Sequence, residues 1–293
     1  MTTLPEPVAA WRDRGRMLSV AGLELFVLDT GPADAEALVV LHGFPTSSYD
    51  WHAALPFLGE RRVVLFDFVG FGLSEKPVRF SYSLHEQADL TVAVLRELGV
   101  VRAHVVAHDM GTSVACELAA RRERGLLSLE LASLVLMNGS VHIELAHLTP
   151  SQRVLLGPAR ALFSRVASGW LFRAQLRRIL GRPISDAELD AMWAGMQYRD
   201  GTARLAQSIG YVRERWQFAE RWIGALGRLD LPCLVLWGPE DPVAVLAIAE
   251  RLAAEIPGAR LELLHGLGHY PQLEDPEATG SAVRRFIESV SAS

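Results

Sequence analysis

Cysteine is scarce in this sequence, and the chain contains no long hydrophobic run. The two cysteines, Cys116 and Cys233, both lie in apolar stretches, so we expect neither a disulfide framework nor a cysteine zinc site. No uncharged apolar run approaches the ~18 residues that are needed to span a bilayer. The first residues, 1–17, lack the apolar segment of a secretory signal peptide. We therefore expect a cytoplasmic protein without a membrane-spanning segment.

Excess positive charge and cofactor motifs are also missing. The formal net charge is -5, which argues against nucleic acid as the main partner. No pair among the nine histidines has the H-E-x-x-H spacing of a metal site. Gly70-Phe71-Gly72 follows a strand-like run but lacks the third glycine of a dinucleotide-binding turn. The sequence therefore predicts neither a metal nor a cofactor.

Short apolar runs recur along the 293 residues, and helical segments separate several of them. The first two runs predict a hairpin, and most of the others are continuous apolar runs, typical of strands covered on both faces of a parallel sheet. The predicted strands are residues 17–20, 23–29, 37–41, 62–66, 103–107, 131–137, 233–237 and 260–264. The predicted helices are residues 84–98, 112–124, 245–255 and 280–290. This alternation predicts an α/β fold with helices on both faces of a mostly parallel sheet.

The alternation of strands and helices stops between residues 141 and 228. This stretch has helical periodicity without a convincing strand, and it holds 13 arginines against 7 acidic residues, whereas the rest of the chain is acidic. We interpret it as a helical lid inserted into a core domain that residues 1–140 and 229–293 form. The alternative interpretation is a helical insertion without a role in function, whose arginines form a solvent-exposed face.

The strongest functional motif runs from Val105 to Ala115, where a β-branched strand leads through a tight turn into a helix. The pattern small-x-nucleophile-x-small is typical of a nucleophile elbow, and Asp109 occupies the position of the nucleophile. Ala107 and Gly111 are the small residues, as expected where a strand and a helix pass close together. The alternative is that Asp109 only caps the following helix.

A second motif, His42-Gly43-Phe44-Pro45, follows the predicted strand at 37–41. A loop of this kind supplies a backbone N–H to an oxyanion hole. We expect that N–H from Phe44, and a second one from Met110, the residue after Asp109.

Two further candidates follow strands near the end of the chain. Asp241 comes after the predicted strand at 233–237, and His269 comes after the one at 260–264. Together with Asp109 they give the chain order nucleophile, acid, histidine, which is that of α/β-hydrolases. Asp241 taken alone is also compatible with capping the helix that begins near Val243. The joint order after three strands favours a catalytic triad of Asp109, Asp241 and His269.

Nearly the whole chain resembles the α/β-hydrolase superfamily, and specifically its aspartate-nucleophile branch of epoxide hydrolases and haloalkane dehalogenases. The resemblance rests on residues 42–49 (HGFPTSSY), 67–72 (DFVGFG) with Ser74, 108–111 (HDMG) and 268–269 (GH). A closer similarity is to the mesoderm-specific-transcript-type hydrolases. It rests on residues 192–195 (MWAG), 221–226 (RWIGAL) and 269–276 (HYPQLEDP).

An aspartate at the elbow suits displacement at a saturated carbon, since an ionised carboxylate needs no base to activate it. The product of this attack is a covalent alkyl-enzyme ester. His269, oriented by Asp241, then activates the water that hydrolyses the ester, and the N–H groups of Phe44 and Met110 hold the developing charge.

The resemblance also bears on the leaving group. Dehalogenases of this branch commonly have a tryptophan directly after the nucleophile, where this chain has Met110. Epoxide hydrolases use two lid tyrosines to protonate the ring oxygen, and the candidates here are Tyr211 and Tyr198, while residues 141–180 contain no tyrosine. We expect hydrolysis of a small apolar epoxide by a monomer or homodimer. The alternatives are haloalkane dehalogenation or lactone-type hydrolysis through Asp109, and a non-catalytic hydrolase-fold protein that binds a hydrophobic ligand.

Overall fold

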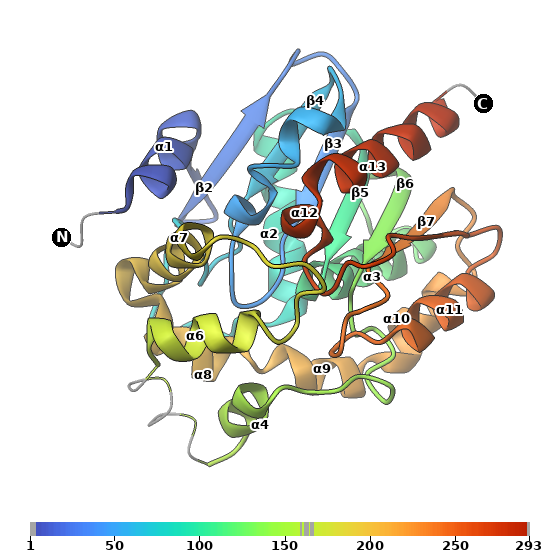
Figure 1. Ribbon diagram of the computed structural model, residues 1–293. Helices are drawn as coiled ribbons and strands as arrows, with labels where there is room; N and C mark the ends of the chain where they lie inside the picture. The colour runs from blue at the N-terminus through green and yellow to red at the C-terminus, as the bar shows by residue number, and fades with distance from the viewer. Residues whose placement is uncertain (1–3, 159, 161–163, 165–166, 292–293) are drawn as a thin grey trace.

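An eight-stranded, mostly parallel sheet forms the centre of the computed structural model, which describes residues 4–158, 160, 164 and 167–291 (Figure 1). The strand order is β1-β2-β4-β3-β5-β6-β7-β8. The pairs β1–β2 and β2–β4 are antiparallel, and the five remaining pairs are parallel. The strands are β1 (Arg16–Val20), β2 (Leu23–Thr30), β3 (Ala37–Leu41), β4 (Arg62–Phe66), β5 (Arg102–His108), β6 (Glu130–Met137), β7 (Cys233–Trp237) and β8 (Arg260–Leu263). All eight predicted strands are confirmed to within one residue at each end.

The buried strands owe their position to continuous apolar sequence. Every residue of β3, β4 and β7 is buried, as expected for strands that helices cover on both faces. Most of β1, by contrast, is exposed at the edge of the sheet. The predicted α/β architecture is therefore confirmed.

Helices cover both faces of this sheet. Figure 1 shows α13 in front of the strands and α2 and α3 behind them. The helices outside the β6–β7 connection are α1 (Glu6–Arg14), η1 (Ser48–Trp51), η2 (Leu55–Leu58), α2 (Leu84–Glu97), α3 (Met110–Glu123), α11 (Leu246–Glu255), α12 (Pro271–Glu274) and α13 (Pro276–Ser291). The four predicted helices correspond to α2, α3, α11 and α13. No helix of the described chain is both long enough and apolar enough to cross a membrane.

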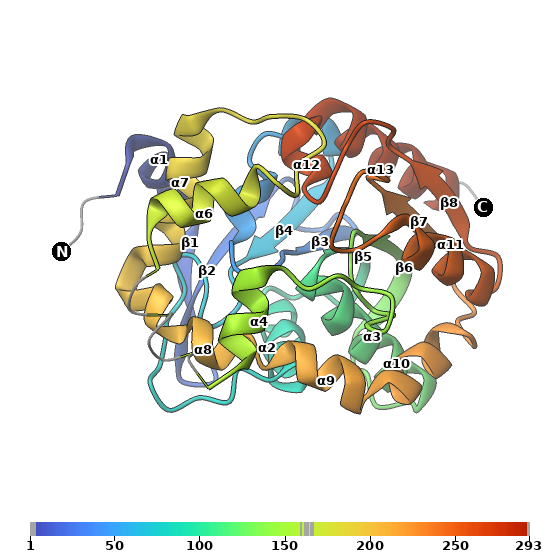
Figure 2. The same ribbon diagram turned by 60° about the horizontal axis from the view of Figure 1, so that its bottom comes forward.

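The described residues of the connection from β6 to β7 form helices joined by loops, with no strand among them. Its elements are α4 (Pro150–Leu156), α6 (Gly169–Leu176), α7 (Asp186–Gln197), η3 (Tyr198–Arg204), α8 (Leu205–Ser208), α9 (Tyr211–Gln217) and α10 (Ala219–Leu226). Side-chain caps set several of the helix starts: Thr149 forms a capping box with Gln152, and Ser168 and Ser185 accept hydrogen bonds from the first turns of α6 and α7. Figure 2 shows α4 and α6 in front of the sheet, and α8 and α9 along the lower side of the view.

Candidate active site

Asp109 lies in a sharp turn between β5 and α3. Its backbone has φ 45° and ψ -110°, a conformation that L-residues rarely adopt, and its side chain makes no capping hydrogen bond to α3. A residue that only capped the helix would place its carboxylate on the N–H groups of the first turn. The capping interpretation therefore does not describe this side chain. Backbone strain at a tight turn between a strand and a helix is typical of a nucleophile elbow.

The turn is possible because two glycines allow close backbone packing. A Cβ atom at Gly111 would lie 2.5 Å from the carbonyl oxygen of Leu41, and one at Gly43 would lie 2.8 Å from the Cβ of Asp109. The end of β3, the start of α3 and the His42-Gly43-Phe44 loop are therefore in direct contact. This contact explains why the residue two positions after Asp109 is the glycine Gly111.

A backbone donor and a cation flank the carboxylate of Asp109, which is only 3% exposed. The N–H of Phe44 donates to Oδ2 at 2.9 Å, and Nη2 of Arg215 lies 3.6 Å from Oδ1. Burial raises the pKa of Asp109, but the positive charges of Arg215 and His269 outweigh it and hold that pKa below its usual value. Asp109 is therefore ionised at neutral pH. The N–H of Met110 makes no hydrogen bond to this carboxylate in the described structure.

Arg215 reaches this position from α9, in the helical connection. Its Nε donates to Oγ of Ser113 at 2.8 Å, and its Nη2 donates to the backbone carbonyl of Asp109 at 3.0 Å. The guanidinium also lies over the ring of Tyr211, 4.7 Å from the centroid. One buried arginine thus joins α9 to the first turn of α3.

Asp241 and His269 form a tight pair next to the elbow. Nδ1 of His269 donates to Oδ2 of Asp241 at 2.6 Å, and both residues are buried. The other oxygen, Oδ1 of Asp241, accepts from the N–H groups of Val243 and Ala244. Helix α11 begins only at Leu246, with Val245 as its N-cap and no side-chain cap, so the helix-cap interpretation of Asp241 is wrong. Asn138, directly after β6, donates from Nδ2 to the same Oδ2 at 2.9 Å. Asp241 therefore combines a structural turn with orientation of the histidine.

The electrostatics of His269 follow from its neighbours. Burial lowers its pKa, but the charge and hydrogen bond of Asp241 and the charge of Asp109 raise it to about 9. Its Nε2 has no hydrogen-bond partner among the described residues. The adjacent His108 donates from Nε2 to the backbone carbonyl of His269 at 2.7 Å, and burial lowers the pKa of His108 to about 4. His108 is thus a neutral residue that supports the backbone of His269.

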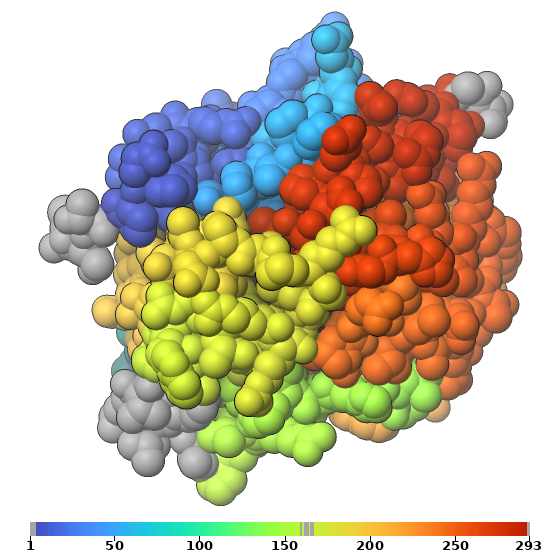
Figure 3. All heavy atoms as spheres, viewed as in Figure 1, coloured from blue at the N-terminus to red at the C-terminus, as the bar shows by residue number. Residues whose placement is uncertain are grey.

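Glu274 holds the His269 loop against the helical connection. Its Oε2 accepts from the N–H groups of Gly268, Gly181 and Arg182, and its Oε1 accepts from the N–H of Tyr270. The N–H of His269 itself donates to the carbonyl of Ile179 at 2.8 Å. Figure 3 shows the yellow surface of the connection against the red C-terminal residues. We call this set of contacts the Glu274 latch.

The two tyrosine candidates occupy different surroundings. Tyr211 is fully buried, packs on the ring of Phe44 at a centroid distance of 5.3 Å, and accepts from Gln152 at its hydroxyl. Burial and the charge of Asp109 raise its pKa. Tyr198 is half-buried, and the cations of Lys76 and Arg199 lie 5.6 and 5.3 Å from its ring centroid. The structure brings Tyr211, but not Tyr198, to the triad candidates.

A small cavity of about 50 Å³ opens beside Phe44. Apolar side chains make up most of its lining, including Phe172, Trp193 and Met196. We call it the inner cavity. Its volume matches a few atoms of a ligand, on the order of three or four water-sized spheres.

Three residues of this site escaped the sequence analysis. Asn138 is a polar residue directly after a buried strand, and that position was a usable signal. Arg215 gave no comparable signal, because it is one of many charged residues in helical sequence, and Glu274 stood in the 269–276 segment with no indication of its backbone partners. Only the tertiary fold turns them inward.

Comparisons with known proteins agree with this architecture. The family profile described as "alpha/beta hydrolase fold" matches residues 36–276. The chain is 42% identical over 282 residues to "Putative hydrolase LipZ" of Mycobacterium tuberculosis, covering 96% of this chain and 98% of that protein. It is 35% identical over 294 residues to the mesoderm-specific transcript homolog protein of Homo sapiens, covering 96% of this chain and 88% of that protein.

A solved structure is similar over the same extent. The crystal structure of a haloalkane dehalogenase from Bradyrhizobium elkani USDA94 superposes with a TM-score of 0.81 at 27% identity, covering 95% of this chain and 98% of that one. The sequence-based resemblance to this group of proteins is therefore confirmed.

Proposed function

Because the chain belongs to the α/β-hydrolase fold family, we propose that it is an epoxide hydrolase that opens an apolar epoxide through an ester of Asp109. The observation that carries this proposal is the placement of an ionised, buried Asp109 between the N–H of Phe44 and the His269–Asp241 pair, with Tyr211 packed on Phe44. Residues 141–228 act in this proposal as a lid over the core of residues 1–140 and 229–293. Arg215 and Glu274 support this arrangement, because each forms hydrogen bonds between residues 141–228 and the core.

The first step is attack of the Asp109 carboxylate on an epoxide carbon. A bond forms between a carboxylate oxygen and that carbon, the carbon–oxygen bond of the ring breaks, and its electron pair stays on the ring oxygen. Tyr211 donates its hydroxyl proton to this oxygen. The guanidinium of Arg215, over the tyrosine ring, stabilises the phenolate that remains.

The second step is hydrolysis of the ester. His269 removes a proton from a water molecule through Nε2, and the resulting hydroxide attacks the carboxyl carbon of Asp109. The negative charge on the carbonyl oxygen is held by the N–H groups of Phe44 and Met110. Loss of one such donor typically costs about 3–4 kcal/mol in the barrier. Collapse of the intermediate breaks the ester bond, and the departing alkoxide takes the proton from His269 to give the diol. The remaining carboxyl proton returns to the Tyr211 phenolate, which restores the Asp109 carboxylate and the starting enzyme.

Haloalkane dehalogenation is the second candidate, and lactone-type hydrolysis through the same nucleophile is a more distant one. The similarity to a haloalkane dehalogenase structure favours a halide leaving group. Trp193 lines the inner cavity, and its indole N–H donates no hydrogen bond within the described structure. This N–H is therefore available to a halide. Met110 offers none from its side chain.

A paired screen separates these candidates. Purified protein is incubated with apolar epoxides and with haloalkanes of matched carbon skeleton, and diol formation and halide release are measured side by side. Diol formation with little halide release supports the proposal. Halide release alone moves the assignment to dehalogenation, and neither product, together with saturable ligand binding, indicates a binding protein.

A further inference from the structure

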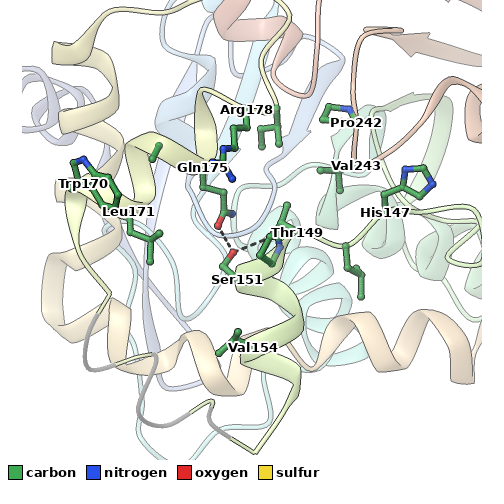
Figure 4. Close-up of a pocket in the computed structure, with 14 residues that line it drawn as sticks. His147, Thr149, Ser151, Val154, Trp170, Leu171, Gln175, Arg178, Pro242 and Val243 are labelled. Carbon is green, nitrogen blue, oxygen red and sulfur yellow. Dashed lines mark hydrogen bonds between the residues drawn. The ribbon is translucent and has the colours of Figure 1, made fainter.

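A second cavity of about 450 Å³ lies between α4, α6 and the loop that carries Asp241 (Figure 4). We call it the outer cavity. Its volume falls in the range of about 300–1,000 Å³ that small-molecule sites occupy. Apolar side chains dominate its lining, and Trp170, which is 72% exposed, lies at one end of it with His147 at the other. An exposed tryptophan beside an open apolar cavity is typical of a ligand site.

The charge inside the outer cavity has one sign. Arg178 supplies a positive charge to its lining, and its described lining contains no aspartate or glutamate. Arg173 and Arg177, close to Arg178 in the sequence, form ion pairs with Asp190 and Asp186. Arg178 is an exposed residue at the rim of the outer cavity, and its guanidinium makes no hydrogen bond or ion pair with any described residue. An unpaired guanidinium beside apolar walls suits a carboxylate attached to an apolar body.

The outer and inner cavities share a wall. Ser151, Leu171 and Gln175 line both of them. A hydrogen bond between the side chains of Ser151, on α4, and Gln175, on α6, crosses this wall (Figure 4). The inner cavity in turn reaches Phe44, whose N–H holds Asp109. A ligand that extended from the outer cavity toward the nucleophile would therefore have to displace this hydrogen bond.

We propose that the outer cavity is a subsite for the apolar chain and terminal carboxylate of an elongated substrate, with the carboxylate at Arg178. The reactive group of that substrate lies in the inner cavity. This inference rests on the proposed function, which identifies the reactive group as an epoxide. The carboxylate subsite adds the class of substrate that carries it. The class is apolar monocarboxylic acids that bear the epoxide far from the acid group.

Binding of unreactive ligands tests the subsite without chemistry. Straight-chain saturated carboxylic acids and the corresponding alcohols are titrated below their micelle concentrations in a calorimeter. We expect the acids to bind more tightly than the alcohols, and Arg178→Gln to weaken acid binding by about fivefold without changing alcohol binding. Arg178→Lys should restore most of the difference, and the control Arg177→Gln should leave it intact. Equal affinity for acids and alcohols, or no effect of Arg178→Gln, overturns the subsite.

Turnover separates failure of the subsite from failure of the proposed function. Acids that carry a terminal epoxide are compared with their methyl esters over a series of chain lengths. We expect a lower KM for the acids at the chain length that spans both cavities, and Arg178→Gln should raise that KM while kcat and the ester kinetics stay constant. Acid-selective binding without any epoxide turnover contradicts the proposed function and leaves the carboxylate subsite standing. Turnover with equal KM values for acid and ester contradicts the subsite alone.

Discussion

Nη2 of Arg215 lies 3.6 Å from Oδ1 of Asp109 and donates a hydrogen bond to the carbonyl oxygen of the same residue at 3.0 Å. One arginine of the helical connection thus contacts both the side chain and the backbone of the proposed nucleophile. Its charge opposes the effect of burial on the Asp109 pKa. The packing of α9 against the first turn of α3 and the low pKa of Asp109 therefore depend on the same side chain.

Replacement of Arg215 by glutamine should raise the pKa of Asp109, because the effect of burial is then opposed by fewer charges. Alkylation needs the ionised carboxylate, so the acidic limb of the single-turnover alkylation rate should move to higher pH. Rapid-quench measurements over a pH series check this shift. Arg213→Gln, which changes an exposed arginine on the same helix, is the matched control. An unchanged acidic limb in Arg215→Gln contradicts the electrostatic role.

Asp109→Ala should abolish turnover while the fold persists. The side chain of Asp109 makes no capping hydrogen bond to α3, so its removal withdraws little support from the helix. We expect a loss of at least about 10³-fold in kcat/KM. The melting temperature should change by no more than about 4 °C, the shift that about 1 kcal/mol produces in a chain of this size. Wild-type turnover by a normally folded variant would remove Asp109 from the mechanism.

His269→Gln should trap the ester, because alkylation requires only the carboxylate whereas hydrolysis requires the base. Intact-protein mass spectrometry after substrate addition should show a stable adduct, and peptide mapping should place it on Asp109. In wild type, one turnover in heavy-oxygen water should leave the label in Asp109 and not in the product. Label in the first product, with no adduct in the variant, indicates direct attack by water.

The pH dependence of kcat should differ from that of kcat/KM. His269 acts as a base only when it is neutral, and its pKa in the free enzyme is about 9, so hydrolysis of the ester speeds up as the pH rises. Ester formation removes the Asp109 charge that helps to raise this pKa, so the midpoint for kcat should lie below 9. Alkylation, which needs Asp109 ionised and not His269 neutral, should stay level across neutral pH. A kcat that falls through this range contradicts the assignment.

The same pKa shift also contributes to stability. A histidine whose pKa is raised by folding stabilises the native state below its unfolded pKa of about 6.5, and this contribution is lost as the pH rises through about 9. Denaturant unfolding of wild type and His269→Gln at pH values on both sides of this window measures the loss. The two proteins should differ less at the alkaline end.

Tyr211→Phe should slow epoxide opening by about 10²-fold or more, since the ring oxygen loses its proton donor. Tyr198→Phe is the matched control, because its ring faces Lys76 and Arg199 instead of the triad candidates, and its rate should stay near that of wild type. Both rates are measured on the best epoxide from the screen. If both substitutions change the rate only slightly and equally, haloalkane dehalogenation is favoured, because a halide leaving group needs no proton.

The strands and the order of the triad candidates were predictable because they depend on local pattern. Continuous apolar runs gave β3, β4 and β7, and the polar residues after strands gave Asp109, Asp241 and His269. The helix α1 was not predicted, since only Val8 and Trp11 of its residues are buried and its periodicity is weak. Arg215 was not predictable either, because the sequence of residues 141–228 contains 13 arginines and does not show which of them the fold turns inward.

The Glu274 latch constrains any motion of the proposed lid, residues 141–228. One carboxylate joins the N–H groups of Gly181 and Arg182 to those of Gly268 and Tyr270, so this edge of the lid cannot move without carrying the backbone of His269 with it. In the proposed mechanism, substrate therefore enters without separating Gly181 and Arg182 from the loop that carries His269. The proton acceptor then keeps its position while substrate binds and product leaves.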